Sequence, residues 1–156
     1  LDINSYELGL SNYNGKAKVY LREGTDFAYS VTVNKKTIFD KKAHELEIDV
    51  MRLDTFIEQN KIAAIDLIKL DVETHEVEVL NGMGRFLNEF KPTFIIEVLN
   101  VEIAEKLSII FDGMDYLYFN IDDKNNSIQR VEVITKSDHW NFLLCNEKIA
   151  KNLGLI

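Results

Sequence analysis

The sequence is poor in cysteine and in long apolar runs, which excludes internal disulfides and membrane-spanning helices. Cys145 is the only cysteine among 156 residues. No disulfide can therefore form within the chain, which suits a reducing cytoplasm. No apolar run approaches the roughly 20 residues that a membrane-spanning helix needs. We therefore expect a cytoplasmic protein that has no membrane partner.

Basic residues are also in short supply. The chain has 18 Lys and Arg against 26 Asp and Glu, and its net charge is −8. Because a nucleic-acid-binding surface needs a basic stripe, we expect no nucleic-acid partner. Three histidines and one cysteine show no zinc-ligand spacing, so we predict no metal centre of that kind. Cys145 lies in an apolar run, which favours a buried small hydrophobe over a reactive thiol.

The hydrophobic pattern predicts one α/β domain over residues 1–156, with a mixed sheet. The Asn14-Gly15 turn predicts an antiparallel hairpin near the N-terminus, and the last strands are expected to be antiparallel. No internal repeat and no linker rich in proline or glycine divides the chain. The pattern predicts strands over residues 2–8, 16–23, 27–34, 47–52, 66–71, 93–99, 116–121, 128–134 and 140–145, and helices over 54–60, 74–90, 101–111 and 147–153. Asp54 and Thr74 are the expected N-caps of the first two helices.

The most informative segment is residues 65–83, a strand that ends in acidic residues and leads at once into a helix. The run over residues 65–70 is too apolar for a strand with one covered face, so it predicts a parallel strand buried on both sides. Asp71 and Glu73 follow at its carboxyl end, where open α/β sheets bind ligands. The plainer interpretation is that these acids only favour the helix N-terminus.

Two more residues are candidates for chemistry at this edge. Glu97 interrupts the apolar strand 93–99, where a carboxylate is costly unless it is paired. If that strand lies beside strand 66–71, then Asp71, Glu73 and Glu97 converge on one edge. His75 follows in the first helical turn, and its ring can carry protons near neutral pH. The plainer alternatives are a glutamate at a frayed strand end and an exposed histidine on a helix.

The segment also resembles a known family signature. Residues 65–73 (IDLIKLDVE), with Glu76 and residues 79–82 (VLNG), resemble the signature of the FkbM-type methyltransferases. Thr74 stands where that signature has a glycine. Weaker matches occur in the same order along the chain: Leu10-Ser11-Asn12 with Gly15, Leu53-Asp54, Lys91-Pro92 with Ile96-Glu97-Val98, and His139 with Asn141-Phe142-Leu143.

The resemblance implies a Rossmann-like sheet and an S-adenosylmethionine-dependent O-methyltransferase that acts on a small-molecule or glycan hydroxyl. It implies that Asp71 and Glu73 line the cofactor cleft and that Glu97 and Asp71 are catalytic, with His75 as a reserve base. The family's glycine-rich cofactor loop would lie upstream of Leu1. We therefore expect an N-terminally truncated domain that is inactive alone, with an unpaired sheet edge that favours homo-oligomers.

Two other functions stay open at this point. The first is a non-catalytic binding or interaction domain derived from a methyltransferase, which Thr74 and the absent glycine loop motivate. The second is a carboxylate-metal hydrolase, in which a divalent cation bridges Asp71, Glu73 and Glu97.

Overall fold

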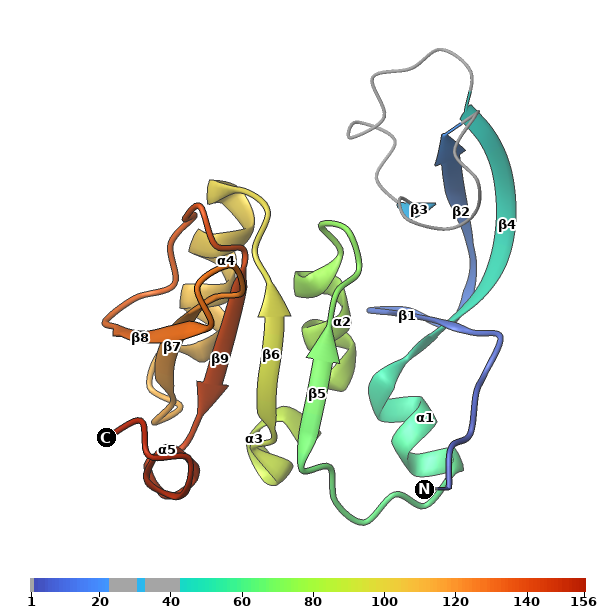
Figure 1. Cartoon of the computed structure of the whole chain (residues 1–156). Coiled ribbons are helices and arrows are strands. Elements are labelled where there is room, and N and C mark those ends of the chain that lie inside the picture. Colours follow the sequence, from blue (N-terminus) through green and yellow to red (C-terminus); the bar gives the residue numbers. More distant parts are fainter. Residues whose placement is uncertain (1, 23–30, 33–42) are drawn as a thin grey trace.

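The computed structural model describes residues 2–22, 31–32 and 43–156, which form two sheets and five helices (Figure 1). The longest described helix has 11 residues, and none in this part of the chain is long and apolar enough to cross a membrane. The strands are β1 (Gly9–Ser11), β2 (Gly15–Arg22), β3 (Val31–Thr32), β4 (Ala43–Arg52), β5 (Leu67–Leu70), β6 (Thr93–Glu97), β7 (Leu117–Asp122), β8 (Ser127–Val131) and β9 (Asn141–Cys145). The helices are α1 (Leu53–Gln59), α2 (Glu76–Met83), α3 (Phe86–Phe90), α4 (Val101–Phe111) and α5 (Glu147–Asn152).

The larger sheet has the strand order β5-β6-β9-β7-β8. β5 and β6 are parallel, while β9 lies antiparallel between β6 and β7. The prediction of a mixed sheet with antiparallel C-terminal strands is therefore confirmed. Helices α2 and α4 lie behind this sheet in Figure 1, where they cover one face. The main core forms there, around fully buried side chains such as Phe94, Ile96 and Leu144.

The opposite face of the sheet is only partly covered. A smaller cluster around Phe119, Leu143 and Cys145 fills one end of it, packed with residues of α5 and the C-terminal tail. On β5, however, Lys69 is exposed and Leu67 is 55% exposed. The expectation that residues 65–70 are buried on both sides is wrong, because β5 is an edge strand and no described helix covers β5 itself on this face.

The smaller sheet has the order β1-β4-β2-β3. β2 is antiparallel to β4 and to β3, but β1 pairs with β4 in parallel. The predicted hairpin at Asn14-Gly15 is therefore wrong, because the turn carries the chain across β4 instead of pairing β1 with β2. Asn14 Oδ1 accepts a hydrogen bond from the Arg52 backbone N–H at 2.8 Å, which fixes that crossing.

Other strand predictions near the N-terminus have mixed outcomes. Residues 2–8 form no strand and are mostly exposed. Of the strand expected over 27–34, only Val31–Thr32 is described, and the rest lies outside the described residues. The expected strand over 47–52 is confirmed and begins earlier, at Ala43.

The boundaries of α1 and α4 agree with the sequence pattern. The pattern over 74–90, which Gly82 and Gly84 interrupt, forms two helices, α2 and α3, that are separated at Gly84, where φ is 56°. α4 begins after Asn100, whose side chain accepts a hydrogen bond from the Ile103 backbone N–H at 2.9 Å. The cap predictions for Asp54 and Thr74 are wrong. Asp54 lies in the first turn of α1 and accepts from the Arg52 guanidinium (Nε to Oδ1, 3.0 Å), which lowers the pKa of its carboxyl. The N-cap position of α2 is His75, not Thr74.

A glycine allows the smaller sheet to pack closely against helix α2. Gly82 lies inside α2, and a Cβ at this position would stand 2.0 Å from the backbone oxygen of Ser11 in β1. Only a residue without a side chain lets β1 approach α2 this closely. The Val79-Leu80-Asn81-Gly82 segment of the signature therefore has a packing role, because it attaches the small sheet to the helix that follows β5.

We predict that Gly82→Ala destabilises the fold by about 2–3 kcal/mol, because β1 must move away from α2. Helix propensity alone would favour alanine by about 1 kcal/mol, so the two effects oppose each other and packing dominates. Thermal unfolding should show a melting temperature lower by roughly 4–12 °C. Asn81→Ala, at the exposed neighbouring position, is the matched control and should change little. A Gly82→Ala protein as stable as the parent would contradict this packing role.

Candidate functional site

Polar side chains form a row across the larger sheet, at the carboxyl end of its parallel strands. Leu70 is paired with Ile96, so the next residues along, Asp71 and Glu97, lie side by side. Glu97 is in turn paired with Asn141 at the start of β9. Since alternate residues of a strand share a face, Lys69 lies on the same face as Asp71. This carboxylate row consists of Lys69, Asp71, Glu97, Asn141 and Asp123.

Hydrogen bonds connect the members of the row. Lys69 Nζ donates to Asp71 Oδ2 at 3.1 Å and to Asn141 Oδ1 at 3.4 Å. Asn141 Nδ2 donates to Asp123 Oδ2 at 3.0 Å. Lys69 and Asn141 are site residues that the sequence analysis missed. Lys69 could have been found from the sequence, because it lies two residues before Asp71 and therefore on the same face of the strand. Asn141 could not, because no local pattern shows that β9 lies beside β6.

Glu97 has the most perturbed carboxyl of the row. Burial, and then the negative charges of Asp71 and Glu73, raise the pKa of Glu97 to about 7. A hydrogen bond with Asp71 contributes to this rise, while the Lys69 ammonium opposes it. Two carboxylates this close favour one shared proton. Glu97 is therefore able to accept or donate a proton near neutral pH.

The loop between β5 and α2 has an unusual backbone. Glu73 and Thr74 both have positive φ, at 52° and 76°. This conformation is unfavourable for a β-branched residue, and the Thr74 Oγ1 is buried without a hydrogen-bond partner. Burial, and then the charge of Asp71, raise the pKa of Glu73. Such strain concentrates at functional sites.

A buried carboxylate holds this loop in place. Glu76 is 1% exposed, and its Oε1 accepts hydrogen bonds from the backbone N–H groups of Val72 (3.4 Å) and Thr74 (3.3 Å). Burial raises the pKa of Glu76, although these hydrogen bonds act in the opposite direction. The sequence analysis placed Glu76 in the family signature, and the structure shows that it positions the loop.

His75 points to the small sheet rather than to the row. Its Nε2 lies 3.0 Å from Ser11 Oγ, and its Nδ1 lies 3.6 Å from Glu78 Oε2. Burial lowers the pKa of His75, so the ring is neutral at pH 7. The order Ser-His-Glu is that of a hydrolase triad, but Ser11 is only 1% exposed and offers no nucleophile to a substrate. The catalytic role of His75 stays a prediction.

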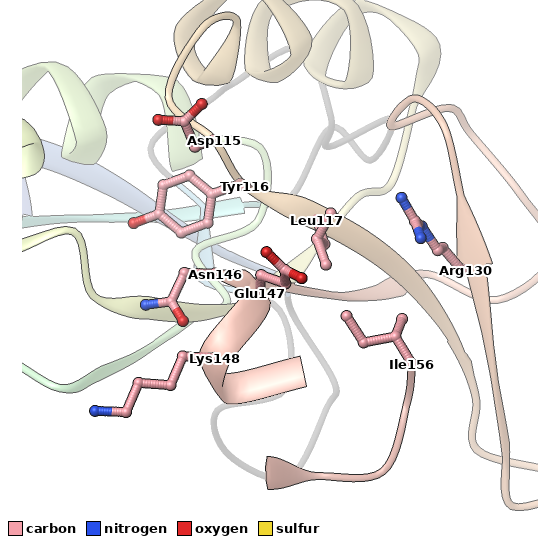
Figure 2. A pocket seen from close by; sticks show the side chains of 8 residues that line it. All are labelled: Asp115, Tyr116, Leu117, Arg130, Asn146, Glu147, Lys148 and Ile156. Carbon is pink, nitrogen blue, oxygen red and sulfur yellow. The ribbon is translucent and has the colours of Figure 1, made fainter. Parts of the chain in front are cut away.

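Two other observations bear on the site. Among the residues the structure describes, no group of three or more His, Cys, Asp or Glu side chains is arranged to hold a metal ion. A hollow of about 730 Å³ lies at the opposite end of β9, around the start of α5 (Figure 2). Its two cations, Arg130 and Lys148, lie on opposite sides in this view, and neither belongs to the carboxylate row.

The raised pKa of Glu97 predicts a pH dependence of stability. The folded state binds the proton more tightly than the unfolded state, so Glu97 favours folding at low pH. This contribution decreases as the pH rises from about 4.5 to about 7. We expect Glu97→Gln to remove that decrease and to raise the melting temperature at pH 8 by about 2–4 °C. Melting curves between pH 4 and pH 8 test this. The control is Glu105→Gln, at an exposed position of α4. An unchanged pH profile in Glu97→Gln would contradict the prediction.

Comparison with known proteins places this geometry in a family. Residues 1–138 match the Methyltransferase FkbM domain. No curated protein and no solved structure matches the chain. The match contains Lys69, Asp71, Glu73 and Glu97, whereas Asn141 lies beyond it. Because the match spans most of the chain, the protein belongs to the FkbM methyltransferase domain family.

Proposed function

We propose that this protein takes part in S-adenosylmethionine-dependent O-methylation of a hydroxyl group on a small molecule or glycan. The observation that carries the proposal is the placement of Glu97 beside Asp71 at the edge of the sheet, where burial and then the charges of Asp71 and Glu73 raise the pKa of Glu97 to about 7. A hydroxyl group that accepts a methyl group must lose its proton, and a base with a pKa near the working pH is suited to that task.

The charge of the row is compatible with the cofactor. Asp71 and Glu73 place enough negative charge beside Glu97 to raise its pKa, so a cation at this edge would be attracted. S-adenosylmethionine carries a sulfonium and an ammonium group. Asp71 and Glu73 would hold these positive groups by charge, and the bound cofactor would supply an electrophilic methyl group.

The other residues would accept the proton or hold the carboxylates in position. Glu97 would accept the proton of the acceptor hydroxyl while the hydroxyl oxygen bonds to the methyl carbon. The bond from that carbon to the sulfonium sulfur would break and leave a neutral thioether. Lys69 fixes Asp71 and Asn141 through its two hydrogen bonds, and Glu76 fixes the loop that carries Glu73. The Asp71 carboxylate and the backbone of the loop that carries Glu73 are therefore held before a substrate arrives, which is the preorganisation that positioning requires.

We predict that Glu97→Gln and Asp71→Asn each lower methyl transfer at least tenfold in the complete protein that contains these residues. The value of kcat/KM should rise with pH through about 7 and should lose that rise in Glu97→Gln. The control is Glu105→Gln, an exposed acid on α4, which should leave turnover unchanged. Unchanged turnover in both row variants would remove the proposed site.

We also propose that the 156-residue chain transfers no methyl group by itself. In Rossmann-like sheets the cofactor lies against further parallel strands and a glycine-rich loop. No strand within residues 2–22, 31–32 and 43–156 pairs with the outer edge of β5, where Leu67 is 55% exposed. The same open edge offers a pairing surface to a second copy of the chain. Assays of labelled methyl transfer to mixed hydroxyl acceptors test the prediction, with the complete protein as the positive control. Measurable transfer by the 156-residue chain would show it wrong.

A second function is a binding domain that has lost catalysis. Thr74 favours it, because a strained β-branched residue stands at positive φ where the family signature has glycine. Methyl transfer by the complete protein distinguishes the two functions. If transfer is absent in the parent and also in Thr74→Gly, while S-adenosylmethionine still raises the melting temperature, the binding function is favoured.

A further inference from the structure

A small hollow adjoins the carboxylate row at the start of β9. It has a volume of about 140 Å³. It is lined by Asp123, Lys124, Asp138, His139, Trp140 and Asn141. Two contacts join it to the row: Asn141 is paired with Glu97, and the Val98 backbone N–H donates to the Trp140 carbonyl oxygen at 2.7 Å. The hollow therefore lies next to the carboxylate that we assign as the base.

Trp140 is the chain's only tryptophan, and it is 53% exposed. The large rings of the core are instead fully buried, as Phe94, Phe111 and Phe142 show. An indole ring left half open beside polar groups offers an apolar face on which a flat or chair-shaped ring can stack.

The polar lining of the hollow contains both donors and acceptors. Asp123 accepts from Asn141, and His139 Nδ1 lies 3.4 Å from Asp122 Oδ1. The Lys124 ammonium adds a positive charge. Asp123 and Asp138 outweigh the single Lys124 charge, so an anionic ligand would be opposed. A hydroxyl group can use the donors and the acceptors of the lining alike. The volume is below the roughly 300 Å³ of a drug-sized site, so it accommodates a single ring.

We propose that the Trp140 hollow is the acceptor subsite, and that it binds a neutral ring carrying adjacent hydroxyl groups, with the ring stacked on the indole and the hydroxyls bonded to Asp123 and Asn141. The assignment as acceptor subsite rests on the proposed methyl transfer. The binding itself does not, so the two are tested separately.

The emission of the single tryptophan reports binding directly in the parent chain. We expect myo-inositol, a cyclic polyol, to change Trp140 emission saturably, with a dissociation constant of about 1 mM or weaker. Sorbitol has as many hydroxyl groups but no ring, and should produce no saturable change. Asp123→Asn, which removes the carboxylate but keeps Trp140, should weaken the binding of myo-inositol at least threefold. Tyr13→Ala, at an exposed aromatic of the small sheet, should leave that binding unchanged.

The following results would overturn all or part of the proposal. Equal responses to sorbitol and myo-inositol would indicate no ring recognition. A saturable response to tetramethylammonium alone would indicate a cation site, and no saturable response to any of the three probes would overturn the subsite. Binding of myo-inositol, together with no methyl transfer by the complete protein, would preserve the subsite but remove its assignment to methylation.

Kinetics in the complete protein give a second readout. Trp140→Ala should raise KM for a cyclic hydroxyl acceptor at least fivefold, with kcat changed less than twofold, because the ring binds but does not react. Trp140→Phe should restore part of the affinity. A fall in kcat without a change in KM would contradict a binding role.

Discussion

The parallel register of β5 and β6 is the constraint on which the site depends. Pairing of Leu70 with Ile96 brings the residues that follow, Asp71 and Glu97, against each other at the sheet edge. Two carboxylates in that position repel unless they share a proton, and the Lys69 ammonium only partly offsets the charge. A shift of one residue in this register would turn Glu97 to the opposite face. The raised pKa of Glu97 is therefore a consequence of strand pairing together with burial.

The loop after β5 depends on contacts with the rest of the fold. Its positive φ values at Glu73 and Thr74 are unfavourable, and the buried Glu76 carboxylate stabilises the loop by accepting from its backbone. The helix that begins at Glu76 is in turn attached to β1, through His75 with Ser11 and through the close approach at Gly82. The small sheet thus supports the helix whose first residue fixes the loop that carries Glu73, although none of its strands belongs to the carboxylate row.

Local patterns predicted most helices and strands, but they did not predict most of the contacts between segments distant in sequence. The range of α4 and the proximity of Asp71 to Glu97 followed from apolar spacing and from the rule that parallel strand ends share an edge. The hairpin at Asn14-Gly15 failed because β4, distant in sequence, lies between β1 and β2. Apolar residues 65–70 predicted burial on both faces, but the run cannot reveal that β5 is an edge strand. Asn141 was missed because no local pattern reveals that β9 lies beside β6, whereas Lys69 could have been found from its spacing of two residues from Asp71.

The start of β9 contacts both the proposed base, Glu97, and the proposed acceptor subsite at Trp140. Asn141 turns its amide to Lys69 and Asp123, and thereby completes the row beside Glu97. The preceding residue, Trp140, lines the hollow while its carbonyl oxygen holds the end of β6. One strand terminus therefore sets both the position of the proton acceptor and the position of a bound ring. The family match ends at residue 138, so the carboxylates lie within the matched part of the chain, while the surface that would select the acceptor lies partly outside it.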